Sequence, residues 1–126
     1  MERAVIVSTA RTPIGKAYRG AFNDTDAASL GGHAIHHALA RANVSVDEVD
    51  DTFMGCSRPQ GSQGKNIARQ CAMAAGLPVT TPAMTVDRQC SSGMMAIGMA
   101  AKSIMTREIE IAVSYTHLRA HETLGN

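Results

Sequence analysis

The chain has 126 residues, a formal net charge of +1, 44% hydrophobic residues and 18% charged residues. This composition is typical of a single globular domain, or of a piece of a larger protein, and it excludes an intrinsically disordered chain. Aromatic residues make up only 3% of the chain and Lys and Arg form no basic stripe, so we expect no nucleic-acid partner.

The first two expected elements are a strand and a helix. Residues 3–10 read RAVIVSTA, a nearly continuous run rich in β-branched residues that predicts a strand buried on both faces. Residues 27–43 then follow a helical pattern, with apolar side chains on one sector. The opposite sector of this helix carries His33, His36 and His37.

The rest of the chain continues the alternation of strands and helices. Strands are predicted at 51–55, 83–87 and 108–113, and helices at 66–76 and 91–105. The order βαβαβαβ predicts a layered α/β domain with a mixed, largely parallel sheet.

The predicted helix at 91–105 is apolar on nearly its whole circumference. A helix of this kind must be buried on every side. In so short a chain nothing is left to cover its outer face, so we expect the α/β domain to be incomplete without a further layer.

The three cysteines form no CxxC pair, which favours a reducing compartment. The N-terminus lacks the features of a signal peptide, and no apolar run approaches the length of a transmembrane helix. The sequence therefore predicts a soluble, cytoplasmic protein with no membrane partner.

Cys90 is the first candidate functional residue. It lies in TVDRQCSSGMMAIG, between the end of a predicted strand and the first turn of the following helix. Ligands of open α/β sheets bind beyond the carboxyl ends of the strands, and the N-terminus of a helix stabilises a thiolate and offers amide groups to an oxyanion. The alternative is a cysteine with a purely structural role near the helix cap.

The other cysteines and the histidines have simpler interpretations. Cys71 lies among alanines in a predicted helix and Cys56 at the end of a strand, and both are interpreted as structural. The spacing of His33, His36 and His37 could place a metal on one helix face, but no carboxylate or cysteine lies nearby in sequence. A solvated histidine face is the favoured interpretation, and we expect no metal site.

Three stretches resemble the N-terminal half of the thiolase family, which comprises acetyl-CoA acetyltransferases and 3-ketoacyl-CoA thiolases. They are AVIVSTARTPIGK, DEVDDTFMGCSRPQGSQGKNIARQCAMAAGLP and TPAMTVDRQCSSGMMAIGMAAKSI. The resemblance runs from Arg3 to about Val113. In thiolases two similar halves stack with helices buried between their sheets, which would explain why the helix at 91–105 is apolar all round.

The resemblance implies an acyltransferase in which Cys90 is the nucleophile that accepts an acyl group from a CoA thioester. The acyl group then passes to CoA or to the enolate of acetyl-CoA. Acyl-CoA and CoA act as substrates, no metal or redox cofactor is needed, and family members are homodimers or homotetramers. The family's activating histidine and second cysteine come from the C-terminal half, so the chain alone is expected to be inactive.

The C-terminal residues depart from the family pattern. After Val113 the sequence reads SYTHLRAHETLGN where thiolases have a glycine-rich stretch. This peptide resembles the translation of a sequencing-library adapter. We therefore expect a thiolase N-terminal domain at 1–113 and a non-native tail at 114–126, in which Tyr115, His117 and His121 have no function.

Two other functions remain as alternatives. One is a condensing enzyme of the ketoacyl-synthase type, which the stretches RTPIGK and PQGSQGKNIARQ disfavour. The other is a non-catalytic, thiolase-like protein that binds acyl-CoA or lipid. The intact cysteine motif disfavours it, because a pure binder has no use for a thiolate.

Overall fold

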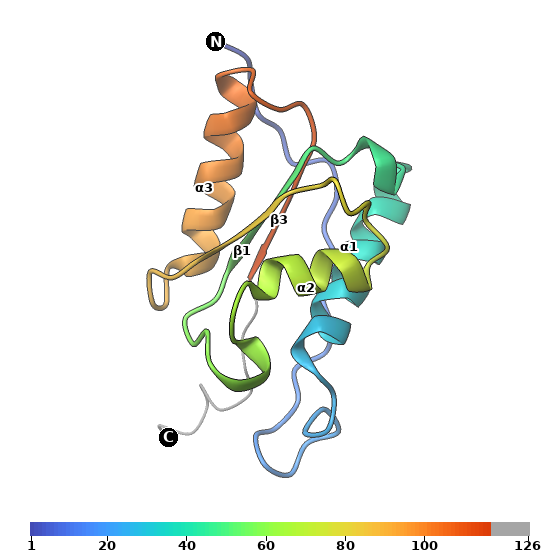
Figure 1. Cartoon of the computed structure of the whole chain (residues 1–126), viewed down its shortest axis with the longest axis vertical. Coiled ribbons are helices and arrows are strands. Elements are labelled where there is room, and N and C mark those ends of the chain that lie inside the picture. The colour runs from blue at the N-terminus through green and yellow to red at the C-terminus, as the bar shows by residue number, and fades with distance from the viewer. Residues whose placement is uncertain (117–126) are drawn as a thin grey trace.

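The computed structural model describes residues 1–116, and within them a small parallel sheet lies between two helical layers. One helix, α3 (Ser92–Met105), covers one face of the sheet. The other face is covered by α2 (Ile67–Ala74), on which α1 (Ala27–Ala42) packs (Figure 1). This is an incomplete α/β domain, as the sequence predicts.

The sheet has the order β2–β1–β3, and all three strands run parallel. The central strand, β1 (Asp51–Gly55), lies between β2 (Ala83–Val86) and β3 (Ala112–Thr116). Their carboxyl ends lie at one edge, because Gly55 pairs with Val86 on one side and with Thr116 on the other. Whatever follows these strands in sequence is therefore gathered at that edge.

The predicted helices form close to their expected bounds, and their caps explain where they begin and end. Asp26 caps α1 by accepting a hydrogen bond from the Ser29 amide at 2.8 Å, and its bonds to Ser29 lower the pKa of its carboxyl. Asn43 ends the same helix in a left-handed conformation. Asn66 caps α2, and Gly76, with a φ of +85°, follows its last turn. The short 3₁₀ helices η1 (Val46–Glu48) and η2 (Gly61–Gln63) lie in the loops.

The last strand begins later than the sequence predicts, at Ala112 rather than at 108. Asp50, just before β1, accepts hydrogen bonds from the amides of Glu110 and Ile111 at 2.8 and 3.0 Å. These bonds lower the pKa of the Asp50 carboxyl and hold the two residues in the approach to the strand. The ladder then starts with the pair Asp51 and Ala112.

The strand predicted at 3–10 is absent from the structure, and this expectation is wrong for the described chain. The segment runs without regular structure, and the side chains of Val5, Ile6 and Val7 are 70–75% exposed. The β-branched run gives a local preference for extended backbone, but a strand also needs a neighbour to pair with. No strand within residues 1–116 pairs with this segment.

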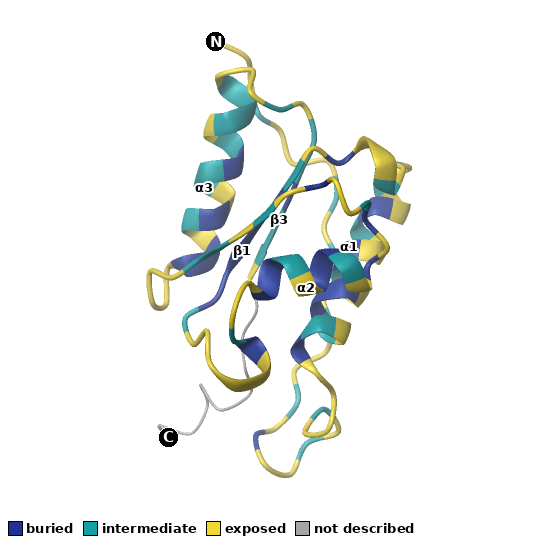
Figure 2. Cartoon of the chain, viewed as in Figure 1, coloured by how far each residue is buried: buried dark blue, intermediate teal, exposed yellow. Residues whose placement is uncertain are grey.

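The core divides into two clusters, one on each face of the sheet. Met54 belongs to the cluster against α1 and α2, whereas its neighbour Phe53 packs with Ala96 and Ala100 of α3, following the alternation of a strand. The side of α3 that faces away from the sheet is largely exposed (Figure 2), and the Met94 side chain there is 77% exposed. Within residues 1–116, no helix is both long enough and apolar enough to cross a membrane.

Candidate active site

Cys90 lies beyond the carboxyl edge of the sheet, in the turn that joins β2 to α3. The turn is the yellow-orange loop at the left edge of Figure 1, just below α3. Cys90 is exposed, two residues before the first residue of α3. The structure therefore places this thiol at the position that the sequence predicts, between a strand end and a helix N-terminus.

The turn before the helix is held in an unusual backbone conformation. Gln89 has a φ of +52°, in the left-handed region that residues other than glycine rarely adopt. Its amide donates a hydrogen bond to Oδ1 of Asp87 at 2.9 Å, and its carbonyl oxygen accepts one from the Ser92 hydroxyl at 2.6 Å. The hydroxyl of Ser91 donates to the Arg88 carbonyl at 2.9 Å. Side chains on both sides of Cys90 thus hold its turn.

Two glycines let the first turn of α3 lie directly against the strand ends. A Cβ on Gly55, the last residue of β1, would lie 2.3 Å from the carbonyl carbon of Ser92. A Cβ on Gly93 would lie 1.5 Å from Oγ1 of Thr116, the last residue of β3. Neither site has room for a side chain, so these contacts fix the helix that follows Cys90 relative to the sheet.

Cys56 and Cys71 differ from Cys90 because both are buried. Cys56 follows β1, and its thiol donates to Oε1 of Gln63 at 3.5 Å. Cys71 lies in the core, where its thiol contacts the Ala27 carbonyl at 3.7 Å and burial raises its pKa. A raised thiol pKa disfavours the thiolate and hence nucleophilic attack. Cys90 is the exposed cysteine of the three.

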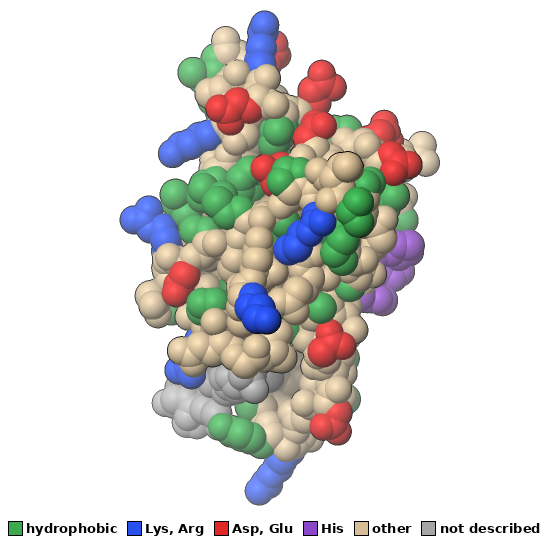
Figure 3. Space-filling model, in the orientation of Figure 1, with side chains coloured by type: hydrophobic (Ala, Val, Ile, Leu, Met, Phe, Trp, Pro, Cys, Tyr) green, Lys and Arg blue, Asp and Glu red, His purple; other side chains and the backbone are tan. Residues whose placement is uncertain are grey.

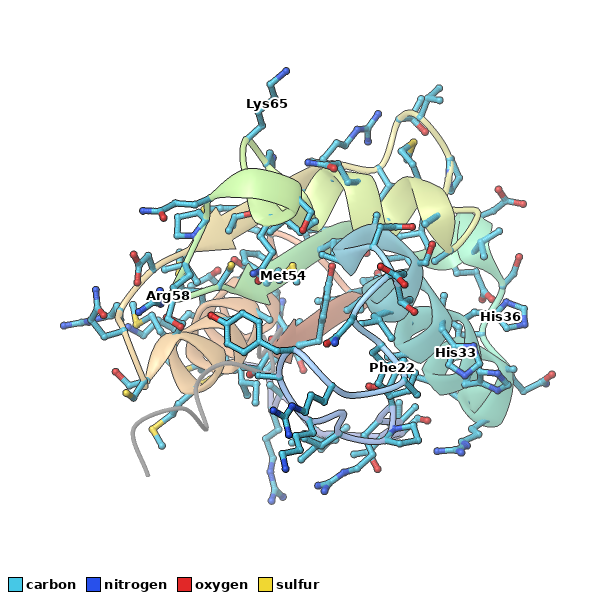
Figure 4. All side chains as sticks on the ribbon, turned by 90° about the horizontal axis from the view of Figure 1, so that it is seen from below. Phe22, His33, His36, Met54, Arg58 and Lys65 are labelled. Carbon is cyan, nitrogen blue, oxygen red and sulfur yellow. The ribbon has the colours of Figure 1, made fainter. Side chains whose placement is uncertain are left out.

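His33, His36 and His37 form an exposed cluster on α1. The rings of His33 and His37 lie 4.3 Å apart and those of His36 and His37 5.4 Å apart. Desolvation, together with the charges of His33 and His36, lowers the pKa of His37. Figure 4 shows His33 and His36 at the outer side of α1, whereas α3 and the Cys90 turn lie across the sheet. These imidazoles are not placed to activate Cys90.

Within residues 1–116, no group of three His, Cys, Asp or Glu side chains has a geometry that could hold a metal ion. Charged residues of both signs are scattered over the face shown in Figure 3, with apolar side chains between them. The described part of this face therefore presents no stripe of a single sign.

The residues just after Val113 extend β3. Ser114 pairs with Phe53, and Tyr115 pairs with Met54. The Tyr115 ring lies near Cys71, and burial raises the pKa of its hydroxyl. His117 and His121 lie outside the described residues. The boundary expected between a native domain and a tail at Val113 stays a prediction.

The comparison with known protein families settles the parentage of the domain. The profile described as "Thiolase, N-terminal domain" matches residues 4–115. The chain belongs to the thiolase family. It is similar to the 3-ketoacyl-CoA thiolases of Bacillus subtilis, at 43% identity, and Vibrio vulnificus, at 41% identity, each over 114 residues. The matched region is 90% of this chain but only 29% and 30% of those thiolases, so the chain spans about three tenths of its relatives' length.

The sequence alone singled out Cys90 as a candidate but missed the groups that shape its turn. Nothing in the sequence pattern marks Asp87, Gln89 or Ser92 as residues that hold a turn. Gly55 has the appearance of an ordinary residue at the end of a strand. The one available signal was the pair of serines after Cys90, which are polar residues at the start of an otherwise apolar helix.

Proposed function

We propose that residues 1–113 are the N-terminal part of a longer thiolase that moves acyl groups between CoA thioesters through Cys90. The observation that carries this proposal is the exposed Cys90 thiol, at the N-terminus of a helix and at the carboxyl edge of a parallel sheet, in a thiolase domain. The names of the relatives, 3-ketoacyl-CoA thiolases, support the substrate class.

The proposed chemistry follows from a nucleophilic thiol. In the degradative direction the Cys90 thiolate attacks the 3-keto carbon of a 3-ketoacyl-CoA, the bond between C2 and C3 breaks, and acetyl-CoA leaves after C2 takes a proton. The thiolate of free CoA then attacks the acyl-enzyme, forms the shortened acyl-CoA and releases Cys90. In the synthetic direction an acetyl group on Cys90 is attacked by the enolate of acetyl-CoA.

The N-terminus of α3 supports both steps. The positive end of the helix dipole attracts negative charge at this position, and the first amides of a helix have no acceptor within the helix itself. The Ser91 and Ser92 amides already donate to the carbonyl oxygens of Arg88 and Gln89 at 3.2 and 3.1 Å. The amides further along the first turn are therefore the better candidates to stabilise an oxyanion.

Acid–base groups must come from elsewhere in the proposed enzyme. A nucleophilic thiol needs a base within hydrogen-bond reach, and the three described histidines lie on the far layer, on α1. We propose that the missing histidine and a second cysteine belong to the C-terminal half. We propose further that the enzyme is a homodimer or homotetramer in the cytoplasm, with CoA thioesters as substrates and no metal or redox cofactor.

The test is CoA-dependent cleavage of a 3-ketoacyl-CoA by the complete enzyme, with acetyl-CoA and the shortened acyl-CoA quantified together. We expect the two products in equal amounts, and none from the 126-residue chain alone, because removing catalytic groups that act as a unit costs several orders of magnitude in rate. Stoichiometric binding of acyl-CoA without cleavage would favour the non-catalytic binding protein instead.

A further inference from the structure

The hydroxyl of Ser92 joins two separate parts of the turn that carries Cys90. Ser92 is the first residue of α3, and only 2% of its surface is exposed. Its Oγ accepts a hydrogen bond from the Arg88 amide at 2.9 Å and donates one to the Gln89 carbonyl at 2.6 Å. Because Arg88 and Gln89 immediately precede Cys90, one buried hydroxyl fixes the backbone from which the thiol projects.

The conformation that these bonds hold is one that the chain would not adopt by itself. Gln89 has a side chain and yet lies in the left-handed region, with a φ of +52°. A strained backbone of this kind persists only where the surrounding structure determines it, and such residues cluster at functional sites. Here the Gln89 carbonyl accepts from both the hydroxyl and the amide of Ser92, at 2.6 and 3.1 Å, and the Gln89 amide donates to the Asp87 carboxylate.

The neighbouring serine does not share this role. Ser91 occupies the N-cap position of α3 without making a side-chain cap hydrogen bond, and its exposed hydroxyl donates to the Arg88 carbonyl rather than to Gln89. The backbone of Ser92 lies directly against Gly55 at the end of β1, which leaves it no room to move toward the sheet. Its backbone is thus fixed against the sheet edge, and its hydroxyl binds the turn, so the turn is placed relative to the sheet.

We propose that Ser92 is a positioning residue for Cys90, whose hydroxyl holds the left-handed turn at Gln89 and so sets the direction from which the thiol meets an acyl group. The proposal rests on the proposed function of Cys90 as the nucleophile. Because Ser92 is only 2% exposed, this role is one of positioning and requires no contact with the substrate. Without its hydroxyl the turn relaxes toward an ordinary conformation and displaces the thiol relative to the first amides of α3.

The test compares three variants in the complete enzyme: Ser92→Ala, Ser92→Thr and Asp87→Ala. For Ser92→Ala we expect kcat to fall about 10- to 100-fold, because a misplacement of about 1 Å costs about that much in an oriented reaction. KM should stay within about threefold, since the substrate-binding groups are unchanged. Ser92→Thr keeps the hydroxyl and should recover most of kcat. Asp87→Ala removes the hydrogen bond to the Gln89 amide and should also lower kcat. Because Asp87 is exposed, this substitution leaves no cavity in the core.

The matched control is Ser103→Ala, the same change on the same helix far from its N-terminus, and it should leave kcat within about twofold, as expected for a position away from the reacting groups. A second readout is the pH profile of Cys90 alkylation by iodoacetamide, which we expect Ser92→Ala to alter and Ser103→Ala to leave unchanged. If Ser92→Ala and Asp87→Ala both keep kcat within twofold of the wild type while Cys90→Ala is inactive, the positioning role is overturned. If Cys90→Ala itself turns over normally, it is the proposed function that fails.

Discussion

Replacing Cys90 with serine in the complete enzyme is expected to abolish turnover, with a loss of at least about a thousandfold. The thiol ionises at ordinary pH far more readily than a hydroxyl, and the thiolate is the nucleophile. The helix N-terminus that favours a thiolate cannot by itself remove the proton of a serine hydroxyl. The measurement is the steady-state rate of acyl transfer between CoA thioesters, with folding checked by the unfolding transition of each variant.

The matched control is Cys71→Ala, a substitution at a cysteine that the structure buries on the other side of the sheet. It removes core packing against Gly31, where a Cβ would lie 2.4 Å from the Cys71 sulfur, and should lower stability rather than kcat. A Cys90→Ala enzyme with normal turnover, or a Cys71→Ala enzyme that folds but is inactive, would contradict the assignment.

The second large effect concerns the 126-residue chain by itself. Its described part exposes Met94 and Ile97 on the outer face of α3, at 77% and 45%, together with the apolar run at Val5, Ile6 and Val7. Apolar surfaces of this kind in soluble proteins are normally covered by another element or partner. We therefore expect the isolated chain to aggregate, or to bind a hydrophobic dye as a molten state does.

The measurement is dye fluorescence and sedimentation of the purified chain. The double variant Met94→Glu with Ile97→Glu should reduce both dye binding and aggregation, because it places charges on the exposed face. As a control, Met54 is 0% exposed, so Met54→Glu should make the chain less ordered rather than more soluble. A soluble wild-type monomer that unfolds in one sharp transition without binding dye would show that this face is stable in water.

Most of the fold could be predicted from local patterns. The cap at Asn66 and the glycine at position 76 located α2, and the bounds of β1 were predicted correctly because an acidic turn precedes it and a Gly- and Gln-rich loop follows it. The alternation of elements indicated a parallel sheet, which the structure confirms. These signals are local, because each reflects the preference of one short segment for helix, strand or turn.

The errors arose where long-range contacts decide. The run at 3–10 has the composition of a strand but no pairing partner within the described chain, and β3 begins late because Asp50 binds the amides before it. At the candidate site, the location of Cys90 between a strand end and an apolar helix was predictable. The hydrogen bonds that fix its turn were not predictable. They depend on the direction in which the Ser92 hydroxyl points and on the close approach of Gly55 to the helix.

The central claim is that Cys90 carries the acyl group, and the most direct measurement is to map that group. The complete enzyme is incubated with isotopically labelled acetyl-CoA, quenched, digested and analysed by mass spectrometry for the acetylated peptide. We predict the label on the peptide that contains Cys90, at up to one acetyl group per chain, and its release when free CoA is added before quenching. A label on Cys56 or Cys71, or no thioester on any cysteine during active turnover, would contradict the account.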